Sequence, residues 1–147
     1  MPLAVERFFQ GYVEAFNRSL GERVDSDGIR AHFSSCFVAA GPQGISCGQN
    51  DDSFSETLEQ GYVFYKGIGT KAMAVLGVAT IPIDDRHQMA NVTYRATYEK
   101  VDGETLELDF SVTYMLAARE ETFEIFAFVA GDEMAHYRKH GLVPDPT

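Results

Sequence analysis

Three successive segments between residues 88 and 129 restrict the fold of this chain more than any other part of the sequence. They cover residues 88–100, 104–117 and 122–129 and are separated by short turns. In the middle segment an apolar residue recurs at every second position. These residues are Leu106, Leu108, Phe110, Val112, Tyr114 and Leu116. A period of two is typical of a β-strand with one buried face. We therefore predict three long antiparallel strands whose apolar face needs a cover.

The first seventy residues contain the helical patterns that can supply this cover. Apolar side chains recur with helical spacing from Val5 to Phe16, which predicts an amphipathic helix of about four turns. A second, shorter helix is capped by one of residues 25–27 and has His32 on its inward face. A third begins at the capping box Ser53-x-x-Glu56 and ends before a glycine. We expect these helices to lie against the sheet.

The other predicted elements complete an α+β order along the chain. They are a brief strand over residues 36–40, a loop or short hairpin over 41–48, an apolar strand over about 71–83, and a short helix after Asp132. The expected fold is a single domain over residues 1–147, with a curved, mostly antiparallel sheet wrapped over three N-terminal helices. The closure of such a sheet over helices makes a pocket.

Composition excludes several classes of function. The net charge is −10, from 22 acidic and 12 basic residues, so clustered cations for nucleic acid or anionic lipid are missing. No apolar run approaches the roughly 20 residues needed to cross a bilayer, and the first residues do not resemble a secretion signal. We expect a cytoplasmic protein. Cys36 and Cys47 are too few for a disulfide framework and are expected as semi-buried thiols.

The last predicted strand has large aromatic residues on both faces. Phe126 and Phe128 alternate with the inward set of that strand, and Met115 of the middle strand can join them on the outer face. Large apolar side chains on an outer face favour a homodimer packed sheet against sheet. The alternative is that the C-terminal segment folds over them.

Phenol and aromatic side chains point from the predicted inward faces into the pocket. Buried phenols need hydrogen-bond partners or a polar ligand, so this lining suits a small apolar ligand that carries one or two oxygens. The expected ligand-binding residues are Phe16, Phe54, Leu58, Tyr65, Tyr94, Tyr98, Phe110, Val112 and Tyr114. Simple core packing of these side chains is the alternative.

Tyr12 and His32 are the candidate catalytic residues. Tyr12 would donate to a ligand oxygen, and His32 would carry a proton, with its helix C-terminus favouring the protonated form. The alternative for His32 is a core histidine that donates to a backbone carbonyl. His136 and His140 are one helical turn apart but lack a third ligand, so we expect neither a metal nor another cofactor.

The order and spacing of these segments resemble the nuclear transport factor 2-like superfamily, which includes ketosteroid isomerase, scytalone dehydratase and the SnoaL-like polyketide cyclases. The resemblance is carried by Phe9-x-x-Tyr12-Val13-x-Ala15-Phe16-Asn17, by residues 25–33, and by the paired strand segments 92–98 and 110–114. It implies a cone-shaped, cystatin-like α+β barrel, open at one end over an apolar cavity, and commonly dimeric through the sheet.

The resemblance does not carry over the chemistry of ketosteroid isomerase. The helix-1 tyrosine that polarises the substrate carbonyl there is matched by Tyr12. The general base matches Gly41, and the second acid matches Val112, so two of three roles are missing. The sequence therefore leaves two functions open. In the first, the protein is a small-molecule pocket protein that binds an apolar oxygenated metabolite or acts on it by acid–base isomerisation, dehydration or hydrolysis. In the second, it is a non-catalytic dimeric module that engages another protein.

Overall fold

The expected order of helices and strands is present in the computed structural model of this chain, which describes residues 4–144. The elements are α1 (Ala4–Ser19), α2 (Ser26–Arg30), β1 (Phe33–Gly41), β2 (Gly44–Gln49), α3 (Asp52–Gly67), β3 (Thr70–Pro82), β4 (His87–Glu99), β5 (Thr105–Arg119), β6 (Thr122–Ala130) and α4 (Glu133–Lys139). The short hairpin was one of two possibilities for residues 41–48, and it is the one that forms, because β1 pairs with β2 through Gly41 and Gly44.

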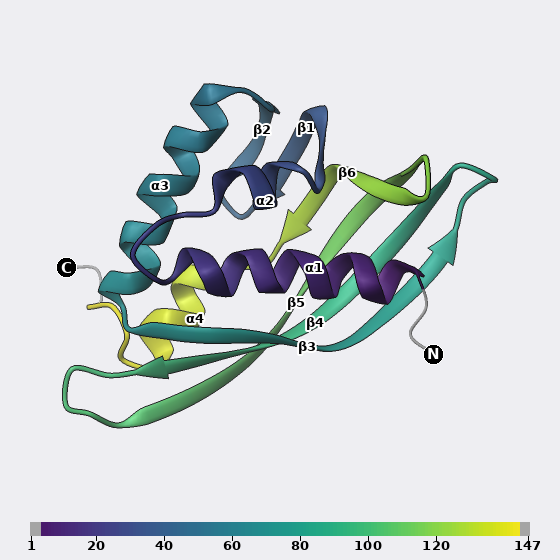
Figure 1. Cartoon of the computed structure of the whole chain (residues 1–147). Coiled ribbons are helices and arrows are strands. Elements are labelled where there is room, and N and C mark those ends of the chain that lie inside the picture. The colour runs from purple at the N-terminus through teal and green to yellow at the C-terminus, as the bar shows by residue number, and fades with distance from the viewer. Residues whose placement is uncertain (1–3, 145–147) are drawn as a thin grey trace.

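The six strands form one curved sheet in the order β2-β1-β6-β5-β4-β3. Neighbouring strands are antiparallel except β1 and β6, which are parallel. Figure 1 shows α1 running across the curved sheet, with α4 following β6 at the C-terminal end of the chain. The edge strands β2 and β3 do not pair with each other, so the sheet is curved but not closed. The predicted α+β class is confirmed.

The core lies between α1 and the inner faces of β4 and β5. Phe9 of α1 is fully buried, and its ring centroid lies 4.7 Å from that of Tyr114. Val92 and Leu116 face the same interior and are also fully buried. Complete burial of one such side chain stabilises the fold by about 1.5–3 kcal/mol relative to exposure. The period-two pattern predicted for β5 is thus the pattern that builds the core.

The side chain of Asn17 joins the end of α1 to the edge strand β3. The backbone N–H of Met73 donates to Asn17 Oδ1 over 2.8 Å, and Asn17 Nδ2 donates to the Met73 carbonyl over 3.0 Å. The Asn17 amide therefore satisfies the N–H and C=O of Met73, which are the groups that an additional strand would pair with at this edge of the sheet. Strand β3 also has an exposed Lys71 near its start, a register shift between Val75 and Gly77, and Pro82 at its end.

Caps and one glycine fix the ends of α3. The expected capping box placed the start at Ser53, but Asp51 is the N-cap, and its carboxylate accepts from the Ser53 backbone N–H over 2.9 Å. Gly69 follows the helix with a φ of +88°, and a Cβ there would overlap the Glu99 carbonyl oxygen. Only glycine fits this junction without strain.

A β-bulge in β6 changes which aromatic residues face the interior. Met115 pairs with Ala127 but Leu116 pairs with Ile125, so Phe126 is the additional residue. Ile125 and Phe128 consequently both face inward, and Phe128 packs against the core. Phe126 instead approaches His87 on the outer side, at a ring-centroid distance of 5.9 Å. The prediction that Phe128 lies on the outer face is therefore wrong, because the bulge reverses the alternation that the prediction assumed.

The outer face of the sheet has an apolar row that crosses all six strands in register. Each member is paired with the next across a strand boundary. The row consists of Ile81, Met89, Met115, Ala127, Val38 and Cys47. Residues directly opposite each other in a sheet place their side chains on the same face. Ile81 and Val38 are exposed in the single chain, at 61% and 38%.

The two cysteines do not match their expected burial. Cys36 and Cys47 are both exposed free thiols, because they project from the outer faces of β1 and β2. Within residues 4–144, no helix has both the length and the apolar character needed to cross a bilayer.

Candidate functional site

A cavity of about 220 Å³ lies between the inner face of the sheet and helices α1, α3 and α4. Most of its wall is aromatic. The lining residues are Tyr12, Phe16, Phe33, Tyr65, Thr70, Met73, Tyr94, Ala96, Tyr98, Phe110, Val112, Tyr114, Phe128, Ala130, Glu133 and Tyr137. An interior that is mainly apolar with a few convergent polar groups is typical of a small-molecule site.

The cavity brings together most of the residues that the sequence singles out. Tyr12 lines it, as do seven of the nine expected ligand-binding residues. Phe54 and Leu58 are the other two, and both pack against the core instead. The ring of Phe54 lies 4.8 Å from that of Phe37 and 5.1 Å from that of Phe33, so it fills the space between α3 and β1.

The phenols of the cavity are neutral hydrogen-bond donors at physiological pH. Burial, with a smaller contribution from the Glu133 carboxylate, raises the pKa of Tyr12 to about 12. Burial is also the main cause that raises the pKa of Tyr65, Tyr94 and Tyr114 above the usual range. Tyr94 and Tyr114 share a hydrogen bond of 2.7 Å between their hydroxyl oxygens. One of these two hydroxyls must donate to the other, which leaves one proton of the pair for a ligand.

Glu133 provides the cavity with its carboxyl group. It lies in the first turn of α4, whose N-cap Asp132 accepts from the Ala135 backbone N–H over 2.9 Å. Among residues 4–144, no side chain forms an ion pair or hydrogen bond with the Glu133 carboxyl. Burial raises the pKa of this group, since the charged form loses water without gaining a partner. A carboxyl whose pKa is raised in this way is a candidate for proton exchange with a bound ligand.

Sequence reasoning missed both Glu133 and Tyr137. The two residues are four positions apart, so they share one face of α4 and reach the cavity together. The sequence predicts a short helix here, but that prediction did not connect the helix with the pocket. The useful signal was the (i, i+4) pairing of a carboxyl and a phenol on an otherwise amphipathic segment.

His32 lies outside the lining of this cavity. Its Nδ1–H donates to the Gly28 carbonyl over 2.8 Å, which matches the alternative of a core histidine. The ring packs against Phe8 and Tyr12, with centroid distances of 4.8 Å and 5.6 Å. Burial lowers the pKa of His32 and outweighs the opposite effect of the Gly28 carbonyl. The expectation of a favoured protonated form is therefore wrong.

Two positions matched to acids in ketosteroid isomerase lie close to the cavity. Val112 is part of its wall, and Gly41 lines an adjoining hollow that also contains Glu133. A carboxyl group thus reaches this region from α4, whereas position 41 has no side chain. Within the part of the chain that the structure describes, no three His, Cys, Asp or Glu residues are arranged to hold a metal ion.

Comparisons with known proteins agree with this architecture. The family model described as NTF2-like protein (DUF6841) matches residues 4–133. No curated protein sequence gives a significant match.

Similar solved structures share the fold at low sequence identity. Aln2 from a Streptomyces species is 15% identical with a TM-score of 0.66, and the alignment covers 92% of this chain and 93% of that one. A ketosteroid isomerase-like protein from Erwinia carotovora atroseptica is 14% identical with a TM-score of 0.60, over 87% and 92% of the two chains. A scytalone dehydratase-like protein from Novosphingobium aromaticivorans is 11% identical with a TM-score of 0.63, over 86% and 79%.

Proposed function

Because the chain belongs to the NTF2-like family DUF6841, we propose that it is a small-molecule pocket protein that binds an apolar, oxygen-bearing metabolite and transfers a proton on it. Members of this fold family often bind small molecules or act as isomerases and dehydratases. One observation carries the proposal. The Glu133 carboxyl has a raised pKa and borders a cavity whose other polar groups are mainly phenols.

In this proposal Tyr12 and Glu133 have complementary roles. The Glu133 carboxylate removes a proton from a carbon next to a ligand carbonyl, and the electrons of that C–H bond move toward the carbonyl oxygen. Tyr12 donates its O–H to this oxygen as negative charge develops there, since its high pKa keeps it protonated. Protonated Glu133 then returns the proton to another carbon, which completes an isomerisation, or to a departing hydroxyl group, which completes a dehydration.

Deuterium exchange into a small ketone tests this chemistry. We expect the protein to accelerate exchange at the α-carbons of 2-indanone in D₂O, followed by NMR. The Glu133→Gln variant should lose about 10²–10⁴-fold of the acceleration, the range for one general base. Tyr12→Phe should also slow the exchange. Exchange that is unchanged in Glu133→Gln would refute the proposed role of Glu133.

The same assay separates Glu133 from the residue that the sequence favours as the proton carrier. His32 remains a prediction for that role, and it packs against the ring of Tyr12. If Glu133 carries the proton, His32→Ala should keep the acceleration of the wild type. A loss in His32→Ala with normal activity in Glu133→Gln would transfer the role to His32. Circular dichroism of both variants controls for misfolding.

We also propose that the protein is a homodimer joined through the outer face of its sheet. The apolar row across the six strands, which includes Met115, favours this assembly, and Phe126 lies on the same face as the row. A non-catalytic dimeric module would use this surface too. Light scattering should give a dimer mass for the wild type and a monomer mass for Met115→Glu. A dimer that persists in Met115→Glu would argue against this interface, whereas the exposed Glu107→Gln is a matched control.

A further inference from the structure

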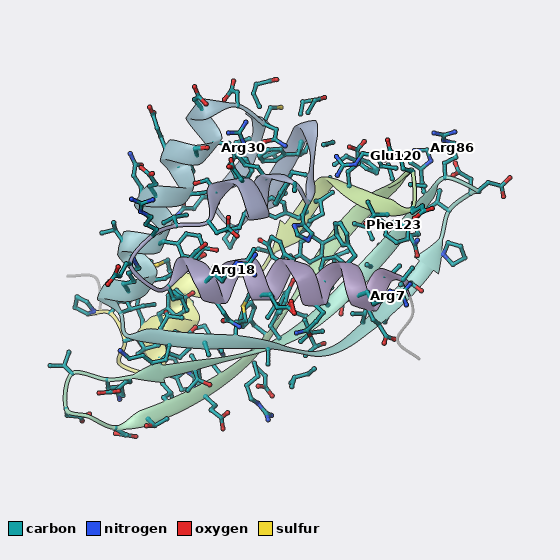
Figure 2. The ribbon with its side chains drawn as sticks, in the orientation of Figure 1. Arg7, Arg18, Arg30, Arg86, Glu120 and Phe123 are labelled. Carbon is teal, nitrogen blue, oxygen red and sulfur yellow. The ribbon has the colours of Figure 1, made fainter. Side chains whose placement is uncertain are left out.

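The wall of the cavity combines aromatic rings with a single carboxyl group among residues 4–144. Ten of its sixteen residues are aromatic, and Glu133 is the only ionisable group of this part of the chain in the wall besides the tyrosines. No lysine, arginine or histidine of residues 4–144 lines it. The arginines labelled in Figure 2 are all outside the lining of the cavity. Arg18 pairs with Asp25 over 2.8 Å, and Arg30 donates to Asn50 over 2.8 Å.

Aromatic faces and an unpaired carboxyl are the chemistry that binds organic cations. The face of an aromatic ring carries partial negative charge, which attracts a cation that lies within about 6 Å of the ring centroid. Rings that line this cavity meet at steep angles, for example 72° between Tyr12 and Tyr114 and 69° between Tyr98 and Tyr137. Neighbouring rings of the wall therefore present their faces in different directions.

Glu133 is placed to complete such a site. Besides the main cavity, it lines two adjoining hollows, one beside the β1–β2 hairpin and one beside β5. Its charge acts on tyrosines from five elements, namely Tyr12, Tyr65, Tyr98, Tyr114 and Tyr137. The carboxyl thus shares the cavity with these phenols and, among residues 4–144, has no cationic partner.

We propose that, within the oxygen-bearing class of ligands, this cavity prefers small organic molecules that also carry an amine, bound as ammonium ions between the aromatic rings and the Glu133 carboxylate. An anionic ligand would meet the same rings and carboxylate without any compensating cation. The net charge of −10 adds a long-range attraction for cations. This inference rests on the proposed function only for the premise that the cavity admits a small organic molecule. An ammonium beside Glu133 also favours the ionised form that the proposed proton transfer needs.

The volume of the cavity limits the size of the amine. A cavity of about 150 Å³ in a protein core holds one benzene molecule. A cavity of about 220 Å³ therefore holds one aromatic ring with a short side chain. The compound 2-phenylethylamine has this size and is protonated at neutral pH, since the pKa of an alkylamine is about 10. Its neutral and anionic counterparts are 2-phenylethanol and phenylacetate.

Calorimetry with these three compounds and the full chain tests the proposal. At pH 7 we expect the amine to bind at least tenfold more tightly than the alcohol, and phenylacetate not to bind. In Glu133→Gln the affinity for the amine should fall to that for the alcohol, while binding of the alcohol stays unchanged. The exposed Glu107→Gln is the matched control and should keep the preference. A thermal melt checks that each variant is folded.

A second measurement needs no variant. Burial raises the pKa of Glu133, and a nearby ammonium lowers it again, so binding of the amine should release protons and strengthen as the pH rises through this pKa. The facing tyrosines have raised pKa values and stay neutral over this range. His136, Asp132 and Asp109 line the adjoining hollow beside β5, and burial lowers the pKa of His136. Calorimetric titration of the protein with the amine, in two buffers that differ in their enthalpy of ionisation, measures this release. The difference between the two binding enthalpies gives the number of protons released.

The outcomes separate this inference from the proposed function. Binding of the alcohol without a preference for the amine would overturn the inference and leave the pocket function intact. A preference that is undiminished in Glu133→Gln, or amine binding without proton release over the pH range in which this carboxyl ionises, would also overturn it. Binding of none of the three compounds would count against both proposals.

Discussion

The hydrogen bond between Tyr94 and Tyr114 allows the interior of the cavity to be tested by a double-mutant cycle. The two hydroxyl oxygens are 2.7 Å apart, and the side chains are only 1% and 4% exposed. Tyr94→Phe and Tyr114→Phe each keep the aromatic ring and remove one partner. An unsatisfied buried hydroxyl costs about 1–3 kcal/mol. Because the cavity is large enough for water, we expect each single variant to lose about 1–2 kcal/mol, in the lower part of this range.

The double variant should lose less than the sum of the two single variants. With both hydroxyls absent no unpaired group remains, so we expect a total loss of about 1–2 kcal/mol and a coupling free energy of about 1 kcal/mol. Urea denaturation measures the free energy of unfolding, and an unchanged dependence on urea concentration would confirm that the unfolded state is comparable.

The outcome that refutes this reasoning is additivity. Single losses that sum to the loss of the double variant within about 0.5 kcal/mol would mean that the two hydroxyls do not interact in solution. Tyr94→Phe combined with Tyr137→Phe is the control cycle, because the hydroxyl of Tyr94 is bonded to Tyr114 and not to Tyr137. That control should be additive.

Three further predictions concern stability. Glu133→Gln should raise the free energy of unfolding at pH 7 and change it little near pH 4. Burial raises the pKa of this carboxyl above 4.5, so the wild type loses stability as the pH rises through the raised value. Equal stability of the two proteins at pH 7 would contradict this. Gly69→Ala should cost more than about 1 kcal/mol by thermal or urea unfolding, since φ is +88° there, whereas Gly77→Ala has open space and should cost less. Phe128→Ala should lower the free energy of unfolding by about 2–3 kcal/mol, and Phe126→Ala should lower it much less. Urea unfolding of a dilute sample measures both values per monomer. The reverse order would contradict the position of the bulge at Phe126.

Most of the fold could be predicted because its signals are local. The alternation from Leu106 to Leu116 depends on one strand having one buried face, and it holds through β5. The bulge at Phe126 could not be predicted in this way. It is a property of the pairing between β5 and β6, whereas the prediction from the sequence assumed an unbroken alternation along the strand.

The site could be predicted only where its residues come from long, regular elements. Tyr94, Tyr98 and Tyr114 follow from the inward faces of β4 and β5, and they line the cavity. Glu133 depends on how a seven-residue helix docks after β6, and a short helix has no strong pattern of its own. For His32, the prediction from the sequence considered only that a helix C-terminus favours the protonated form. Burial has the larger effect and lowers the pKa of His32.

The contact between Asn17 and Met73 has a consequence for solubility. An open sheet exposes unpaired backbone groups along its rim, and such rims invite other chains to add strands and grow into fibres. Here a side-chain amide from α1 blocks that rim near the start of β3, where Lys71 also lies, while Pro82 discourages docking at the other end. Strand β3 can therefore remain an edge of an unclosed sheet without becoming a template for aggregation.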